Sequence, residues 1–152
     1  MKLALLVCLA ACAGSQAAPA HPDPASARAA ITAVLDAQSA AWNRGDLAGY
    51  MDGYVHTPSL VFTSGGHIRR GWQDAFDHYK ARYASDPKAM GHLALTVDQI
   101  DLVGAGGDAA VVLGRWDLTG TEHAGRGVFS LIVEHQRAGW RILHDHTSSE
   151  TP

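Results

Sequence analysis

The sequence predicts an α+β fold in which helices come first and a run of strands follows. Apolar residues recur at helical spacing in the first half of the chain. From His92 onward, long strand-like segments alternate with glycine-rich turns, as expected of consecutive antiparallel strands. Because the two kinds of element are segregated along the chain, we expect helices packed on one face of a curved sheet.

The first expected helix starts at Ser26, a residue type that commonly caps a helix N-terminus. It should end at Asn43-Arg44-Gly45, with the glycine in the left-handed conformation that follows many helices. Asp46 can cap a second, short helix. Helical spacing supports both helices, at Ile31, Val34, Leu35, Gln38, Ala41 and Trp42 in the first and at Leu47, Tyr50, Met51 and Tyr54 in the second.

A short hairpin and a third helix follow. Leu60–Ser64 is the first expected strand, Gly65-Gly66 is a two-residue turn signal, and His67–Arg70 can pair back. The third helix ends before Pro87. Its apolar residues fall at positions i, i+3, i+4, i+7 and i+11, namely Trp72, Ala75, Phe76, Tyr79 and Tyr83.

Four long strands complete the expected fold. The pattern places them at residues 92–103, 109–119, 127–135 and 139–149, with glycine-containing turns at 104–108 and 120–125. Side chains alternate faces along a strand. If the last strand is regular, one face carries the side chains of Trp140, Ile142, His144 and His146. The opposite face carries those of Arg141, Leu143, Asp145 and Thr147.

The last strand carries the candidate catalytic residues. Its first face begins apolar and ends with His144 and His146, as expected where a strand leaves the core at the mouth of a pocket. Imidazole titrates near neutral pH and suits general acid or base catalysis. The alternative is a structural role for both histidines, hydrogen-bonded in the pocket wall. Asp145 points to the opposite face of a regular strand, but a bulge would turn it into the pocket as a base.

No metal site is predicted. A His-x-His pair can ligate a metal ion when a third ligand arrives from elsewhere. The spacing selects no such ligand among the candidates His56, His67 and His92.

Aromatic residues are the candidate ligand-binding residues. Tyr54 and Trp72 lie near the ends of their elements, where a pocket would open. Buried Tyr and Trp generally need a partner for their polar atom, so these residues could also orient a ligand. The alternative is a core role. The full candidate set is Tyr50, Tyr54, Phe62, Trp72 and Trp116.

Composition limits the partners. A chain of 152 residues suits one domain, and its net charge of −3 argues against a nucleic acid bound by a basic patch. No nucleophile motif, phosphate loop or metal signature is present, and no cofactor is expected.

The N-terminus predicts export. Lys2 precedes an apolar run, Leu3–Ala11, that is too short to span a bilayer permanently. Leu9-Ala10-Ala11-Cys12 resembles a lipobox, so residues 1–12 are expected to be a signal peptide and Cys12 the lipidated mature N-terminus. Cleavage near Ala17 or Ala18 is the alternative. Residues 13–25 form an Ala/Pro-rich tether, and 26–149 the folded domain. The expected location is the periplasm or the outer membrane, as an anchored lipoprotein.

Several motifs resemble the SnoaL-like, nuclear transport factor 2-like superfamily, and in particular a subfamily of mostly uncharacterised small bacterial proteins. The likeness covers about Ala27 to Ser149. It rests on Ala41-Trp42-Asn43-Arg44-Gly45-Asp46, Gly71-Trp72, Gly114-Arg115-Trp116, Gly127-Val128-Phe129-Ser130-Leu131, Gly139-Trp140-Arg141-Ile142 and Asp145-His146-Thr147-Ser148.

The resemblance implies a cone-shaped domain, a curved antiparallel sheet with three helices on its concave face and a pocket between them. It also implies a homodimer. The expected strand at 109–119 has apolar residues on both faces, namely Val111, Val112 and Leu113, and this pattern agrees with an outer sheet face that is covered by a partner. Relatives include ketosteroid isomerase, dehydratases, epoxide hydrolases, polyketide cyclases and non-catalytic association domains. No motif here places an isomerase's Asp base and Tyr donor.

Three functions remain open at this point. The first is an exported domain that binds a small molecule in an aromatic, histidine-edged pocket. The second is a cofactor-independent isomerase, dehydratase or hydrolase that uses a pocket His or Asp. The third is a homodimeric association module, which would be favoured if side chains filled the pocket. Fold alone does not choose among them.

Overall fold

The computed structural model of the chain describes residues 23–83 and 87–150. The expected signal peptide, Cys12 and most of the expected tether lie outside the described residues. The fold is α+β, as predicted, with three α-helices and a six-stranded sheet.

The first two helices meet at a capped junction. Helix α1 spans Pro24–Asn43 and α2 spans Leu47–Met51. The expected N-cap of α1 at Ser26 is wrong: the cap is Asp23, whose carboxylate accepts a 3.0 Å hydrogen bond from the Ser26 amide. Proline suits the first helical position, so the helix starts earlier than expected. Gly45, at φ 77°, and the cap Asp46 agree with the predicted end of α1 and start of α2.

Strands β1 (Val61–Ser64) and β2 (His67–Arg70) form the predicted hairpin, and α3 (Trp72–Tyr83) follows. A 3₁₀ turn, η1 (Pro87–Met90), leads into β3 (His92–Val103). The meander continues through β4 (Ala109–Thr119), β5 (Gly125–Gln136) and β6 (Gly139–Ser149).

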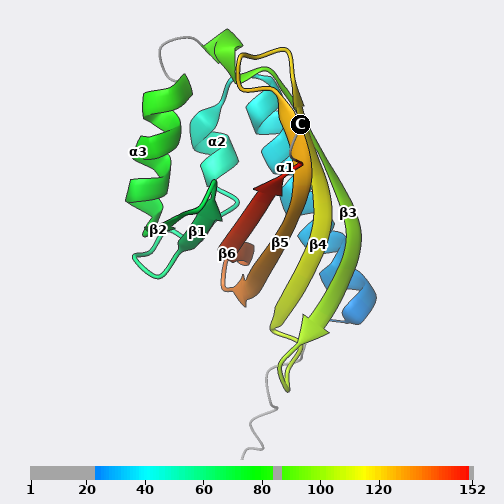
Figure 1. Cartoon of the computed structure of the whole chain (residues 1–152). Helices are drawn as coiled ribbons and strands as arrows, with labels where there is room; N and C mark the ends of the chain where they lie inside the picture. The colour runs from blue at the N-terminus through cyan, green and yellow to red at the C-terminus, as the bar shows by residue number, and fades with distance from the viewer. Residues whose placement is uncertain (1–22, 84–86, 151–152) are drawn as a thin grey trace, which may run out of the picture.

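The sheet order is β2-β1-β6-β5-β4-β3. All neighbours are antiparallel except β1 and β6, which run parallel with Phe62 opposite Asp145 and Ser64 opposite Thr147. This parallel pair joins the early hairpin to the last strand (Figure 1). It therefore brings two parts of the chain that are far apart in sequence to the same region of the sheet.

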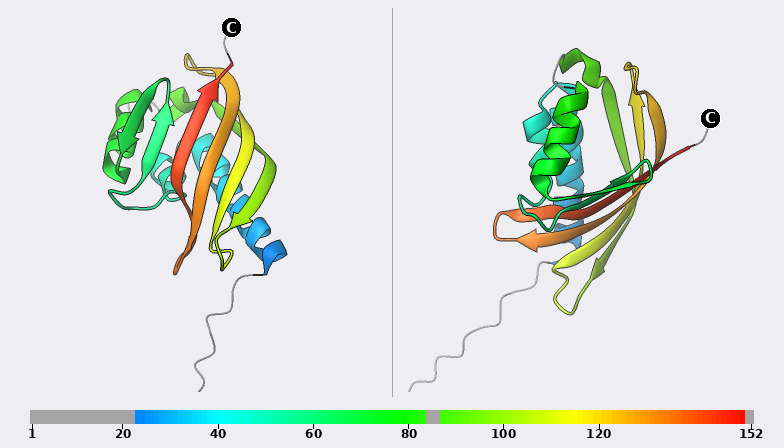
Figure 2. Two further views of the ribbon diagram at one scale, coloured as in Figure 1. Left: turned by 60° about the horizontal axis from the view of Figure 1, so that its bottom comes forward. Right: turned by 60° about the vertical axis from the view of Figure 1, so that its left-hand side comes forward.

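The sheet curls around the helices. Figure 2 shows α1, α2 and α3 on its concave side, and α1 packs against β3 and β6. The cone-shaped arrangement expected from the resemblance is therefore present. Among the described residues, no helix has both the length and the apolar character needed to cross a bilayer.

Trp42 and Asn43, at the end of α1, join this helix to η1 and to the start of β3. The Trp42 indole donates a 2.7 Å hydrogen bond to the Met90 carbonyl. The Asn43 amide both accepts from and donates to the backbone of Leu93, at 2.7 and 3.0 Å. The sequence suggested only turn chemistry for Asn43, but its side chain fixes the start of β3 against α1.

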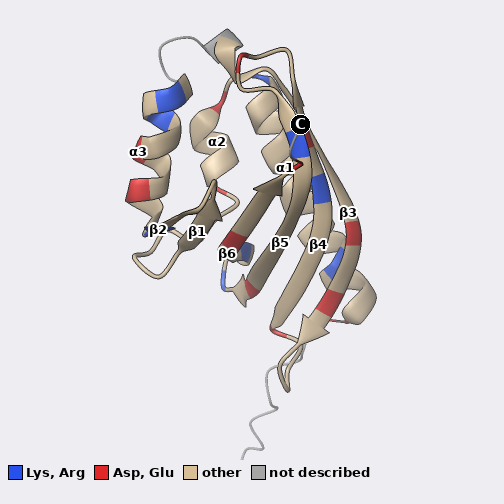
Figure 3. Ribbon diagram, in the orientation of Figure 1, with Lys and Arg blue, Asp and Glu red and all other residues tan. Residues whose placement is uncertain are grey.

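The surface has an apolar region on the sheet and a basic region on α3. The convex face of the sheet exposes apolar side chains at Val103, Leu113, Val128 and Ile132. In contrast, the last turn of α3 carries the basic residues Lys80 and Arg82 (Figure 3).

Candidate functional site

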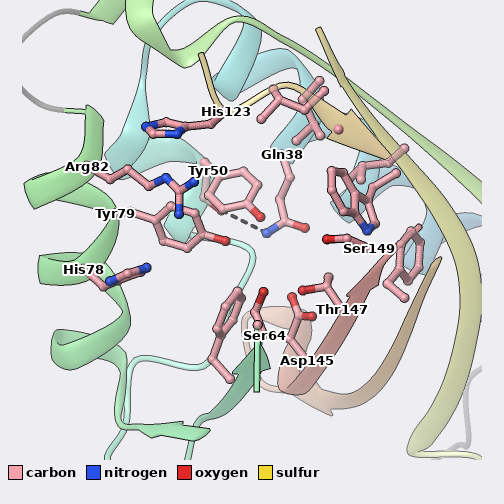
Figure 4. A pocket seen from close by; sticks show the side chains of 18 of the residues that line it. Gln38, Tyr50, Ser64, His78, Tyr79, Arg82, His123, Asp145, Thr147 and Ser149 are labelled. Carbon is pink, nitrogen blue, oxygen red and sulfur yellow. Dashed lines mark hydrogen bonds between the residues drawn. The ribbon is translucent and has the colours of Figure 1, made fainter. Parts of the chain in front are cut away.

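A cavity of about 780 Å³ lies between the helices and the concave face of the sheet. Strands β1 and β6 supply polar side chains on one wall, Ser64, Asp145 and Thr147. Gln38 of α1, Tyr50 of α2 and Tyr79 of α3 face them from the helices (Figure 4). The size is typical of a site for a small organic molecule.

A bulge in β6 decides which residues face this cavity. Val133 of β5 pairs with Ile142, but the preceding Ile132 pairs with His144, so Leu143 is an extra residue in β6. An extra residue reverses the faces of the side chains that follow it. Trp140 and Ile142 are buried as predicted, and beyond the bulge Asp145, Thr147 and Ser149 line the cavity.

The prediction that His144 and His146 face the cavity is therefore wrong. Neither is among the lining residues, and His146 is exposed. His144 pairs with Ile132, whose side chain is exposed on the convex face, and this pairing carries the imidazole to the outer side. The sequence analysis had noted that a bulge would bring Asp145 inward, and the structure contains that bulge.

Asp145 is the buried carboxyl group of the site, with only 4% of its surface exposed. Its Oδ2 accepts a 2.8 Å hydrogen bond from the hydroxyl of Tyr54, which lies 3.2 Å from the hydroxyl of Tyr50. Its Oδ1 has no hydrogen-bond partner within the described part of the chain. A buried acceptor without a partner is costly, so this oxygen is well suited to contact a ligand.

Burial changes the acidity of this group. Loss of solvation raises the pKa of Asp145 from 3.8 to about 7, and the hydrogen bond from Tyr54 opposes that rise. Near neutral pH the carboxyl therefore exists in both forms. It can donate a proton to a ligand in one form and accept a proton in the other.

The neighbouring tyrosines are held in their protonated form. Desolvation, followed by the charge of Asp145, raises the pKa of Tyr50 to about 12 and that of Tyr54 well above 10. Desolvation and the nearby Tyr50 do the same to the pKa of Tyr79. These phenols therefore remain hydrogen-bond donors across the ordinary pH range.

Most of the expected ligand-binding aromatics line the cavity. Tyr50, Tyr54, Phe62 and Trp116 all contribute to its wall. Trp72 is not a lining residue, so its predicted place in the wall is wrong. Its indole donates a 3.0 Å hydrogen bond to the Met51 carbonyl and stacks on Phe76 with a centroid separation of 4.9 Å. The hydrogen bond joins α3 to α2, and the stacking contact lies within α3.

The sequence analysis missed several lining residues. Gln38 is buried in the apolar series of α1, where a polar residue is a signal in itself, and its amide nitrogen donates a 3.0 Å hydrogen bond to the Tyr50 carbonyl. Its carbonyl oxygen points into the cavity (Figure 4). Tyr79 had been assigned only to helical spacing, and Ser64 and Thr147 had no signal.

The histidines considered as metal ligands do not converge. Within residues 23–83 and 87–150, no three His, Cys, Asp or Glu side chains are grouped to hold a metal ion.

Comparison with known proteins identifies related sequences and folds. The model of the SnoaL-like domain family matches residues 31–152. An NTF2-like protein of unknown function from Shewanella oneidensis is 39% identical, with a TM-score of 0.74 and coverage of 80% of this chain and 98% of that one. A search of curated proteins gave no match.

A second solved structure shows similarity of fold. It is a nuclear transport factor 2-like superfamily protein from Salmonella enterica serovar Typhimurium, 18% identical, with a TM-score of 0.67 and coverage of 86% of this chain and 95% of that one.

Proposed function

The chain belongs to the SnoaL-like domain family, and from this premise we propose that its cavity binds a small organic molecule and that Asp145 exchanges a proton with it. The unpartnered, buried Oδ1 of Asp145 in the cavity wall is the observation that carries this proposal. The acid–base role that the sequence first suggested for His144 and His146 thus passes to Asp145.

The wall around Asp145 favours a ligand with a flat apolar body. Phe62 and Phe129 line the cavity from the sheet, and Tyr50 and Tyr79 line it from the helices. The ring centroids of Tyr50 and Tyr79 are 5.5 Å apart. Aromatic walls with a few directed polar groups are typical of small-molecule sites. Here the polar groups include Tyr54 and Gln38, whose positions are fixed by their own hydrogen bonds.

Proton transfer fits the isomerase, dehydratase or hydrolase class considered from the sequence. The general base must reach the hydrogen it abstracts, and Oδ1 is the oxygen of Asp145 that accepts no hydrogen bond from the described residues. Tyr54 holds Oδ2 and so orients the carboxyl group. A pure association module is less well supported, because side chains leave about 780 Å³ of the interior open.

A hydrogen-exchange experiment tests this proposal. The protein would be incubated in heavy water with a panel of carbonyl compounds that carry acidic C–H groups, and deuterium incorporation followed by mass spectrometry. Asp145→Asn should lower the exchange rate of any active compound by about 10²–10⁴-fold, the usual contribution of a general base.

His146→Ala is the matched control, because its side chain is exposed and outside the cavity wall. It should exchange at the wild-type rate. Loss of exchange in the histidine variant with retention in Asp145→Asn would contradict the proposal. Binding by the wild-type protein without any exchange would favour a ligand-binding domain over an enzyme.

Export and lipid anchoring are also proposed, on the basis of Leu9-Ala10-Ala11-Cys12. The proposal places the domain in the periplasm or at the outer membrane, tethered through Cys12. Mass spectrometry of protein from a native membrane fraction would detect an acylated Cys12. An unmodified N-terminus near Ala18 would exclude the lipid, though not export.

A homodimer is the proposed assembly. Support comes from the convex sheet face, where Leu113, Val128 and Ile132 are exposed on adjacent strands. Contiguous exposed apolar surface is uncommon on monomeric proteins and commonly marks an interface.

A further inference from the structure

One side of the cavity wall is basic. His67 and Arg69 of β2 and His78 and Arg82 of α3 all line it. Figure 4 shows His78 and Arg82 extending from α3 toward the cavity, on the side away from Asp145. The chain as a whole has a net charge of −3, so this group is a local excess of positive charge.

No carboxylate in the part of the chain that the structure describes neutralises the two arginines of this group. Among the described residues, neither Arg69 nor Arg82 forms an ion pair, whereas Arg126, elsewhere in the wall, pairs with Glu150 at 2.9 Å. The Arg82 guanidinium lies 5.8 Å from the centroid of the Tyr83 ring. Within residues 23–83 and 87–150, no carboxylate therefore competes with a ligand for either guanidinium group.

His78 lies close enough to both arginines for their charges to affect its pKa. Desolvation lowers its pKa, and so do the charges of Arg69 and Arg82, while Asp74 opposes the shift. Both arginines are therefore close enough to His78 to influence it. A neutral imidazole in this position can donate or accept a hydrogen bond beside an anion.

We propose that the ligand is an organic anion, with an apolar body against the aromatic wall and one anionic group bound by Arg69 and Arg82. This inference rests on the proposed function and specifies its ligand class. Guanidinium groups bind carboxylate and similar oxyanions with paired hydrogen bonds of favourable geometry. The anionic group is the shared chemistry, whether it is a carboxylate, sulfonate or phosphate.

The position of Asp145 orients this ligand. A second anion beside a buried carboxyl group is unfavourable, so the charged end of the ligand lies at the arginines. The uncharged end then reaches Asp145 and the Tyr54 hydroxyl. A second anionic group at the other end of the ligand would be unfavourable beside the ionised form of Asp145.

A pair of fluorescent probes tests the inference. Anilinonaphthalene sulfonate carries an anionic group, and its parent phenylnaphthylamine has the same rings without the charge. Affinities of both would be measured for the wild-type protein, for Arg69→Gln/Arg82→Gln and for Lys80→Gln. Lys80 is the matched control, since it is an exposed cation on α3 that does not line the cavity. Circular dichroism would confirm that each variant is folded.

The double arginine variant should bind the sulfonate at least about tenfold more weakly, because charge-assisted hydrogen bonds are lost. Its affinity for the uncharged probe should not change, and Lys80→Gln should match the wild type for both. Equal loss of both probes, or no loss of the sulfonate, would overturn the inference.

Failure of the proposed function has a different signature. Leu95→Trp places a larger side chain in the cavity from β3 and should weaken both probes if they bind there. If the wild type binds neither probe, or if Leu95→Trp changes neither affinity, the cavity is not the binding site. The anion inference then fails together with the proposed function.

Discussion

The hydroxyl of Tyr54 donates a 2.8 Å hydrogen bond to Oδ2 of Asp145, and the two residues are 91 positions apart in the sequence. The backbone also joins these regions, through a parallel bridge between Tyr54 and Ile142. The segment after α2 therefore helps to position a carboxyl group on β6, and its tyrosine limits the rise in pKa that burial causes.

Tyr54→Phe should raise the pKa of Asp145 above about 7. The Tyr54 hydrogen bond stabilises the ionised carboxylate, and phenylalanine keeps the ring while removing that bond. Carboxyl resonances of isotope-labelled Asp145, followed by NMR as a function of pH, would measure the change. Tyr50→Phe is the control: Tyr50 contacts Tyr54 but not the carboxyl group, so a smaller shift is expected. An unchanged or lower pKa in Tyr54→Phe would contradict the proposed effect of the bond.

Asp145→Asn should stabilise the fold increasingly as pH rises. The carboxyl pKa is 3.8 in the unfolded reference and about 7 in the folded protein, so the folded state binds more protons between these values. The unfolding free energy of the wild type therefore falls over this interval, and the cost of the buried charge is complete above about pH 7.

That cost is about 4 kcal/mol for a shift of this size, and asparagine does not incur it. Urea denaturation of both proteins from pH about 4 to about 8 would measure the difference in unfolding free energy. At pH values below the pKa of the carboxyl group in the unfolded chain, the pH-dependent part of this difference in unfolding free energy should vanish. A difference that stays constant with pH would show that Asp145 is ionised throughout.

Trp140→Ala should lower the unfolding free energy by about 3–5 kcal/mol. Trp140 is only 3% exposed on β6 and packs beside Ile31 and Val34 of α1. Its loss would leave a space between the sheet and the longest helix. His146→Ala, on the same strand but exposed, should change stability by less than about 0.5 kcal/mol. Equal denaturation midpoints for both variants would contradict the assignment of Trp140 to the core.

Leu113→Glu and Val128→Glu should each convert the proposed dimer to a monomer. Both side chains are exposed on the convex face, where a carboxylate would have to be desolvated at the interface. Sedimentation velocity at micromolar concentrations would measure the assembly. Ile68→Glu is the control, since Ile68 is also exposed but lies on the β2 hairpin. A wild-type protein that sediments as a monomer would refute the dimer.

Local sequence determined most of the elements. Trp72, Ala75, Phe76, Tyr79 and Tyr83 lie on one side of a helix, and α3 spans Trp72–Tyr83. Gly65 and Gly66 both have positive φ, as the hairpin turn between β1 and β2 requires. Spacing and turn residues act within a few positions of the chain, so a single sequence is enough to predict them.

Tertiary structure decided the candidate site. Leu143 is an ordinary strand residue by sequence, and its role as the extra residue depends on how β6 pairs with β5. That one-residue shift turned Asp145 into the cavity and His144 and His146 away from it. The parallel pairing of β1 with β6 likewise placed Phe62 beside Asp145. Bulges and long-range strand pairings depend on packing between distant segments, so they cannot be predicted from the alternation of residues along one strand.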